Sequence, residues 1–280
     1  MPFRPAHMVQ LMSIVGQVDR IETRKHMGPG GRANVVVVCG GRWHDFDFAR
    51  LQLLTMLADF GEAKSRVFED YDCLEALTSA DLLVTYTCDV RPNASQQQAL
   101  VEFVARGGRW LALHASNSAI TSPQENGGRT FTTPRDFGPV ASVLGSQFLA
   151  HPPITPYEVQ LTQPDHPLVV GVAPFTVTDE LYISELHPTI DVILHAEYTG
   201  ECRGFDEGHT ADADVRPVLY TKPHGEGMVC YFTLGHCRGR FDMQDMGIDD
   251  LGKIDLGSWL VPEFREILGR AMNWGVRGSW

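Results

Sequence analysis

Long apolar runs are missing from this 280-residue sequence, and no stretch approaches the roughly 20 residues that a membrane-spanning helix needs. Basic residues are also scarce: 23 Lys and Arg stand against 35 Asp and Glu, a formal net charge of −12. Because nucleic acids and anionic membranes are bound by basic surfaces, this charge argues against both kinds of partner. The first 20 residues lack the basic-then-apolar order of a secretory signal, so the sequence predicts a cytoplasmic protein.

Cysteine is sparse as well. The six cysteines are scattered along the chain and form no Cys-x-x-Cys pair. This pattern predicts reduced thiols and argues against a disulfide framework or a cysteine zinc site. A chain of this length buries a large core without such cross-links.

Strand and helix patterns alternate through the first part of the chain. Residues 1–33 end in HMGPGGR and are interpreted as an N-terminal arm, followed by a single domain over 34–280. Strands are expected at 34–41, 64–70, 81–88 and 109–116, with helices at 46–61, 72–80 and 95–108, the last capped by Ser95. Such alternation predicts a mostly parallel sheet flanked by helices. Ligands bind such sheets beyond the carboxyl ends of the strands, here residues 39–46, 86–91 and 113–118.

The rhythm changes after residue 118. A helix is expected at 138–145, and strands at 157–162, 175–183, 191–199, 216–222 and 228–236. The last two flank PHGEG, so they predict an antiparallel hairpin that extends the sheet. Residues 237–260 are expected to form a long loop before a final helix at 262–274. Formation of a homo-oligomer through that helix stays open, because nothing in the sequence specifies it.

Two Gly-x-Cys-x-Gly motifs suggest a glutamine amidotransferase, which presents its cysteine nucleophile on a strand-to-helix elbow. Cys237 follows a strand pattern, but no helical pattern comes after it and no histidine lies downstream. Cys202 lies only 22 residues before His224, whose His-Gly-Glu sits on the predicted hairpin turn. We therefore expect no cysteine nucleophile. The end of the fourth strand, where an elbow belongs, carries His114 instead.

Several motifs in a fixed order resemble the ThuA-like family, which is named for a trehalose-utilisation protein. They are GGRWHDF (40–46), ALHAS (112–116), FLAHPP (148–153), TDELY (178–182) and TLGH (233–236). The resemblance implies a flavodoxin-like, class I glutamine amidotransferase-like α/β fold without the amidotransferase cysteine. It also implies a role in disaccharide utilisation through oxidised (3-keto) glycosides. The N-terminal arm and the 237–260 segment depart from the family pattern.

The candidate catalytic residues are polar side chains at these element ends: His44, Asp45, His114, His151, Glu180 and His236. His44 and His114 follow strands one and four, whose ends meet in this topology. Paired imidazoles can polarise a carbonyl, shuttle protons or bind a metal. The bland alternative for each histidine is a side chain hydrogen-bonded to nearby backbone, and Asp45 could equally cap the first helix.

The candidate substrate-binding residues are neighbours of these groups: Trp43, Ser116, Asp179 and Tyr182. Trp43 and Tyr182 could stack on a sugar ring, although Trp43 fits the core equally well. Two functions follow. One is an isomerase, lyase or hydrolase of sugar derivatives that uses acid–base groups or a divalent metal held by His44, His114 and His236. The other is a non-catalytic sugar-binding or scaffolding protein.

Overall fold

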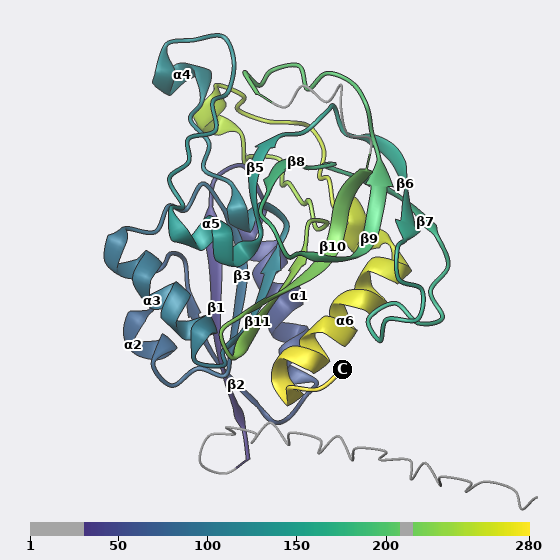
Figure 1. Cartoon of the computed structure of the whole chain (residues 1–280). Coiled ribbons are helices and arrows are strands. Elements are labelled where there is room, and N and C mark those ends of the chain that lie inside the picture. Colours follow the sequence, from purple (N-terminus) through teal and green to yellow (C-terminus); the bar gives the residue numbers. More distant parts are fainter. Residues whose placement is uncertain (1–30, 208–214) are drawn as a thin grey trace, which may run out of the picture.

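The computed structural model describes residues 31–207 and 215–280, which build a nine-stranded mixed sheet (Figure 1). In order across the sheet, its strands are β2 (Ala63–Phe68), β1 (Ala33–Gly41), β3 (Leu82–Cys88), β4 (Arg109–Leu113), β11 (Gly227–Phe232), β10 (Val215–His224), β9 (Asp191–Glu197), β6 (Thr155–Leu161) and β7 (Phe175–Asp179). A separate antiparallel pair joins β5 (Ser146–Ala150) to β8 (Ile183–Leu186).

The sheet is parallel in one half and antiparallel in the other. The first five strands in the order above are mutually parallel, and every later neighbouring pair is antiparallel. The predicted hairpin of β10 and β11 is confirmed. The expectation of a mostly parallel sheet was wrong for the second half. There, antiparallel neighbours need no helical crossover, and a short turn joins β10 to β11.

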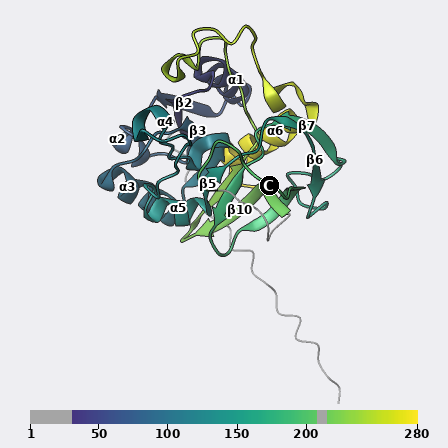
Figure 2. The same cartoon turned by 90° about the horizontal axis from the view of Figure 1, so that it is seen from above.

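Helices cover both faces of the sheet. α1 (Phe46–Ala58) and α6 (Pro262–Arg277) lie on one face, and α2 (Leu74–Leu77), α3 (Ala94–Ala105) and α5 (Pro139–Leu144) on the other (Figures 1 and 2). Strand β1 serves both layers: Val35 and Val37 belong to the α1/α6 core, whereas Val36 and Val38 belong to the opposite core. Such a strand must be apolar along its whole length, as observed.

The connections contain short helices: α4 (Pro123–Asn126), η1 (His114–Asn117), η2 (Gln244–Met246) and η3 (Gly257–Leu260). Apart from the last two, the predicted 237–260 segment is loop. The N-cap of α3 is Asn93 rather than the predicted Ser95, because Asn93 Oδ1 accepts the Ser95 and Gln96 amides and Gln96 bonds back. Residues 1–30 of the predicted arm lie outside the described residues. Among residues 31–207 and 215–280, no helix has the length and apolarity to cross a bilayer.

The turn between β10 and β11 depends on a glycine. Gly225 has φ +57, and a Cβ there would overlap the backbone carbonyl of Ala105. We expect Gly225→Ala to destabilise the protein by about 1 kcal/mol or more beyond the cost of Gly171→Ala, whose φ is +80 in open space. Denaturant unfolding of both variants measures the difference. Equal losses would mean that the carbonyl contact carries no penalty.

Candidate functional site

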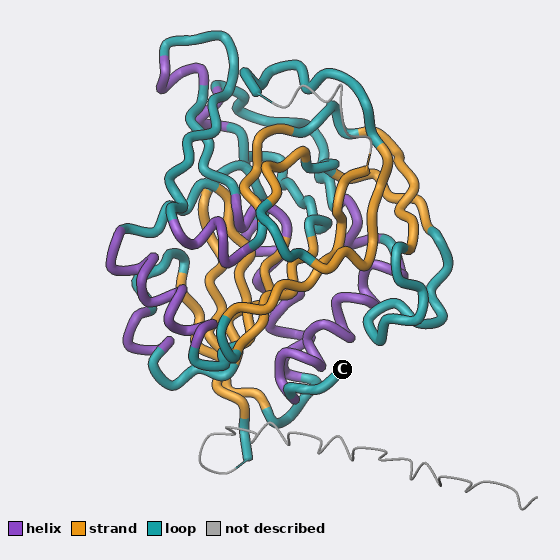
Figure 3. Tube along the Cα trace, in the orientation of Figure 1, coloured by secondary structure: helices purple, strands orange, loops and turns teal. Residues whose placement is uncertain are grey.

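Three histidines meet at the carboxyl edge of the parallel half of the sheet. His44 follows β1, His114 directly follows β4, and His236 follows β11. Because β11 pairs in parallel with β4, the ends of these strands lie together although their residues are far apart in sequence. Long loops gather at this upper end of the molecule (Figure 3). The site therefore lies where open α/β sheets bind their ligands.

The backbone at this edge takes an uncommon conformation. Among the described residues, four non-glycine residues have positive φ, and three of them follow parallel strands: Trp43 (+67), Asp89 (+58) and His114 (+47). A left-handed backbone is disfavoured for residues with a Cβ and gathers at functional sites. His114 thus takes a strained backbone conformation directly after β4.

The rings of His44 and His114 face each other, with their Nε2 atoms 2.9 Å apart. His44 Nδ1 lies 3.1 Å from the Arg42 carbonyl, and His114 Nδ1 lies 2.9 Å from the Thr233 carbonyl. A carbonyl only accepts, so each Nδ1 carries a proton and each ring turns its Nε2 atom inward. Burial lowers the pKa of His44 to about 3, which keeps this ring neutral. Two nitrogens at this distance either share a proton or bind one cation together.

Glu180 is the centre of the cluster. One carboxylate oxygen, Oε2, lies 3.4 Å from His114 Nε2 and 3.8 Å from His44 Nε2. The other, Oε1, lies 3.2 Å from His236 Nδ1 and 3.7 Å from His151 Nε2. Burial raises the pKa of the Glu180 carboxyl, but the imidazoles of His151 and His236 outweigh burial and hold the pKa well below its usual value. The cluster therefore contains a buried carboxylate.

His236 is fully buried without a hydrogen bond at either ring nitrogen among the described residues. Its Nδ1 approaches Glu180 outside hydrogen-bond geometry. Burial lowers the pKa of His236, yet the Glu180 carboxylate outweighs burial and the pKa is raised. An unsatisfied buried imidazole is costly, so a missing partner is indicated.

A divalent metal fits these donors. One ligand atom from each of His44, His114, Glu180 and His236 lies within 4.8 Å of the others. Imidazole and carboxylate donors suit zinc and other transition metals. The Nδ1 bonds to backbone carbonyls supply the outer contacts that orient histidine ligands.

Three further side chains border the cluster. The Tyr182 hydroxyl lies 3.1 Å from His114 Nε2 and 3.4 Å from Glu180 Oε2. Arg238 donates from Nη2 to Glu180 Oε1 (3.2 Å) and from Nε to the Trp43 carbonyl (2.8 Å). The side chains of His151 and Arg238 are 24% and 20% exposed, whereas that of Glu180 is 4% exposed. His151 and Arg238, which border the cluster of His44, His114, Glu180 and His236, are thus more exposed than Glu180.

Sequence reasoning missed Arg238, although its signal was present in GHCRG. In extended chain, alternate residues point the same way, so His236 and Arg238 share a side and Cys237 takes the other. The Cys237 thiol is buried 3.1 Å from the Tyr86 hydroxyl, and burial raises its pKa. Burial likewise raises the pKa of Cys202 to about 11. Both thiols are therefore protonated and unsuited to nucleophilic attack.

Three candidates form hydrogen bonds with backbone groups. Asp45 caps α1 by accepting the Phe48 amide at 2.9 Å. The buried Ser116 hydroxyl bonds to the carbonyls of Leu113 and Thr85. The Asp179 carboxylate accepts the backbone amides of Glu180, Gly235, His236 and Ser258, at 2.8, 3.2, 3.1 and 3.0 Å. Asp179 therefore holds together the two chain segments that carry Glu180 and His236.

Trp43 lies in an aromatic cluster beside the site. Its indole donates to Asp245 Oδ1 at 3.1 Å and meets Phe131 edge-on at 5.9 Å. Tyr182 belongs to the same cluster and meets Phe148 at 4.7 Å. These contacts make Trp43 partly core, while its place next to His44 keeps it at the site.

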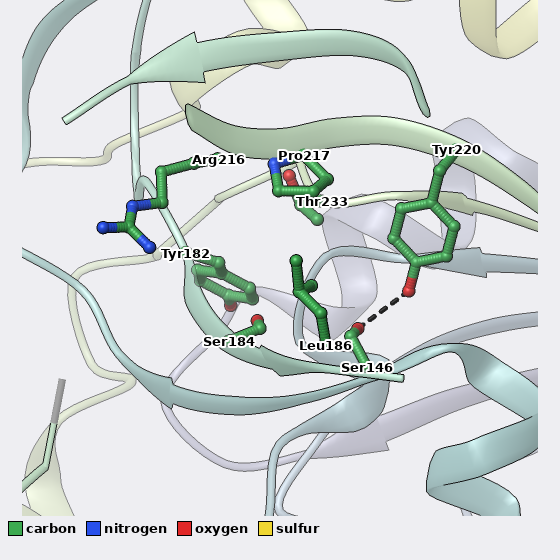
Figure 4. A pocket seen from close by; sticks show the side chains of 8 residues that line it. All are labelled: Ser146, Tyr182, Ser184, Leu186, Arg216, Pro217, Tyr220 and Thr233. Carbon is green, nitrogen blue, oxygen red and sulfur yellow. Dashed lines mark hydrogen bonds between the residues drawn. The ribbon is translucent and has the colours of Figure 1, made fainter. Parts of the chain in front are cut away.

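A small cavity lies against Tyr182. Its volume is about 10 Å³. In its wall, the hydroxyl oxygens of Ser146 and Tyr220 lie 2.7 Å apart and share a hydrogen bond (Figure 4). The full lining is Ser146, Tyr182, Ser184, Leu186, Arg216, Pro217, Tyr220 and Thr233. Such a space is the size of one water molecule, so it does not admit a sugar.

Comparison with known proteins places the chain among similar folds. The family model described as ThuA, trehalose utilisation, matches residues 34–247. A ThuA-like protein from Bacteroides uniformis has a TM-score of 0.60 and 15% identity over 89% of this chain and 93% of that one. A ThuA-like protein from Parabacteroides merdae has a TM-score of 0.58 and 17% identity over 89% and 91%. A protein from Salmonella typhimurium described as cytoplasmic has a TM-score of 0.52 and 13% identity over 88% and 99%. No curated protein matches.

The contacts of Asp179 generate a prediction. Asp179→Asn replaces an oxygen that accepts backbone amides with a donor, so we expect a loss of about 1–3 kcal/mol in unfolding free energy. Because His236 and Glu180 then lose their support, metal affinity should fall by about 10- to 100-fold. Denaturant unfolding and metal titration measure the two effects. The exposed Asp165→Asn is the control, and an unchanged Asp179→Asn protein would refute the supporting role.

Proposed function

The chain belongs to the ThuA family of trehalose utilisation, and from this premise we propose that it is an enzyme of carbohydrate utilisation. Its substrate is a disaccharide-derived sugar or keto-sugar, and its reaction takes place at the cluster of His44, His114, Glu180 and His236. Isomerisation, elimination and hydrolysis are all compatible with these groups. A cytoplasmic location and a sugar ligand belong to the same proposal. It includes no nucleic-acid or membrane partner, because the chain is acidic.

One observation carries the proposal: the Nε2 atoms of His44 and His114 face each other at 2.9 Å while both Nδ1 atoms are held by carbonyls. Together with the Glu180 carboxylate and the unbonded His236, this arrangement concentrates acceptors in a buried space. We infer that these four residues hold a divalent metal. When bound, such an ion polarises a carbonyl or hydroxyl oxygen of the substrate.

The partly exposed residues are suited to proton transfer and charge stabilisation. His151 donates from Nδ1 to the Pro152 carbonyl at 2.8 Å, and its Nε2 lies 3.7 Å from Glu180 Oε1 at the edge of the cluster. In this position Nε2 can remove a proton from a substrate atom next to a carbonyl. The Arg238 guanidinium can stabilise the oxygen that becomes negative, and the Tyr182 hydroxyl can donate to the same region. Trp43 offers an apolar face to a sugar ring.

Elemental analysis of the purified protein tests the metal site. We expect about one divalent metal ion per chain, lost in the His44→Ala/His114→Ala variant because two of four ligands are removed. His187→Ala is the control, since His187 has no side-chain bond among the described residues and lies outside the cluster. A wild-type protein that is metal-free and takes up no added metal would overturn the metal site and leave acid–base chemistry by the histidines.

Substitution of His151 separates catalysis from sugar binding. With trehalose and its 3-keto derivative as probes, we expect His151→Gln to reduce turnover by roughly 100-fold or more while metal content stays unchanged. Thermal shifts with the same sugars measure binding independently. Sugar binding without turnover in the wild type would favour the alternative, a non-catalytic sugar-binding protein.

A further inference from the structure

The metal-binding cluster is sealed in this structure. His44, His114, Glu180 and His236 are 5%, 1%, 3% and 0% exposed. The one small cavity against Tyr182 has room for a water molecule only. A sugar therefore reaches these side chains only if part of the chain moves.

The loop of residues 239–254 leaves the edge of the cluster at Arg238, which bonds Glu180, and returns at Asp255. Its neck is a backbone bridge between Arg238 and Asp255, with amide-to-carbonyl distances of 2.7 and 2.8 Å. At its tip, Met243 and Met246 pack against the aromatic cluster that contains Trp43. The loop joins the upper end of the molecule, where α4 also lies (Figure 1). It has a narrow base and a tip held by side chains, as a movable cover requires.

One side chain fastens the tip. Asp245 Oδ2 accepts from Arg42 Nε (3.0 Å) and Nη2 (2.8 Å), and Asp245 Oδ1 accepts from Trp43 Nε1 (3.1 Å). Arg42 also bonds Glu125 of α4 at 2.7 Å. The Arg42 and Asp245 side chains are 28% and 40% exposed, so water and salt compete for their ion pair. The ion pair between Arg42 and Asp245 can therefore form when the loop closes and break when it opens.

The fastening acts on the two residues that precede a metal ligand. The Arg42 carbonyl accepts the Nδ1 proton of His44, and Trp43 has the left-handed backbone described above. Arg238, at the neck of the loop, bonds both the Trp43 carbonyl and Glu180. Closing the loop therefore fixes the segment that aims His44 into the cluster.

We propose that residues 239–254 form a lid over the cluster, and that Asp245 is its latch and a positioning residue for His44. This inference rests on the proposed metal site. When the latch releases, Met243 and Met246 leave the aromatic cluster, and the space that they fill becomes the entrance. When it closes, water is excluded and His44 is aligned.

The first test measures metal release to EDTA from metal-loaded, full-length protein. We expect Asp245→Ala to release metal about fivefold faster or more, because loss of a partly exposed ion pair favours the open form. Salt should speed release from the wild type and have less effect on Asp245→Ala. Asp249→Ala is the matched control, since Asp249 lies on the same loop, is exposed and has no side-chain bond among the described residues. Equal rates in the two variants would overturn the latch.

The second test does not depend on metal. Limited trypsin digestion followed by mass spectrometry should show faster cleavage after Arg240 and Lys253 in Asp245→Ala than in Asp249→Ala. If the wild type binds no metal, the metal proposal fails, and faster cleavage still supports a released loop. Faster cleavage without faster metal release would show that the loop moves but does not gate the site, which would overturn the lid. Unchanged cleavage would overturn it as well.

Discussion

The site depends on two hydrogen bonds from histidine rings to backbone carbonyls, and neither carbonyl takes part in a reaction. The Arg42 and Thr233 carbonyls each fix one proton on a histidine Nδ1, so Nε2 is the atom that each ring turns toward the cluster. Backbone carbonyls cannot change their role, so the choice of this atom is made by the fold. Since Thr233 belongs to the chain after β11 and Arg42 to the chain after β1, the tautomers are set by the packing of the parallel strands.

A carboxylate performs the corresponding task for Glu180 and His236, the other two residues of the cluster. Asp179 gathers backbone amides from the segments that carry Glu180 and His236, so these side chains do not have to be placed by their own contacts. Each of the four residues of the cluster is thus placed by a hydrogen bond that involves the main chain. The Glu180 carboxylate contacts Arg238 and Tyr182 in addition to the histidines around it. Rigid supports of this kind give a metal or substrate site its precision.

Sequence reasoning located much of this arrangement. The carboxyl-end rule for parallel strands identified His44 and His114, because both follow continuous β-branched or apolar runs. The position of His236 required the motif order, since β11 enters the sheet beside β4 and order along the chain does not reveal order across a sheet. Arg238 was missed because the Gly-x-Cys-x-Gly pattern indicates Cys237 as the functional residue of that segment. Asp179, Ser116 and Asp45 all contact backbone groups, and sequence does not show whether a polar side chain meets a ligand or its own backbone.

The place of β11 between β4 and β10 also has a consequence for how the chain folds. Until residues near 230 are available, β4 has one unpaired side in the middle of the future sheet, and such an edge invites pairing with other chains. The contacts that close the sheet span much of the sequence, which slows folding because distant segments must meet first. Nascent chains that stall before β11 would therefore be prone to aggregate, and the C-terminal hairpin acts as the step that commits the domain to its native state.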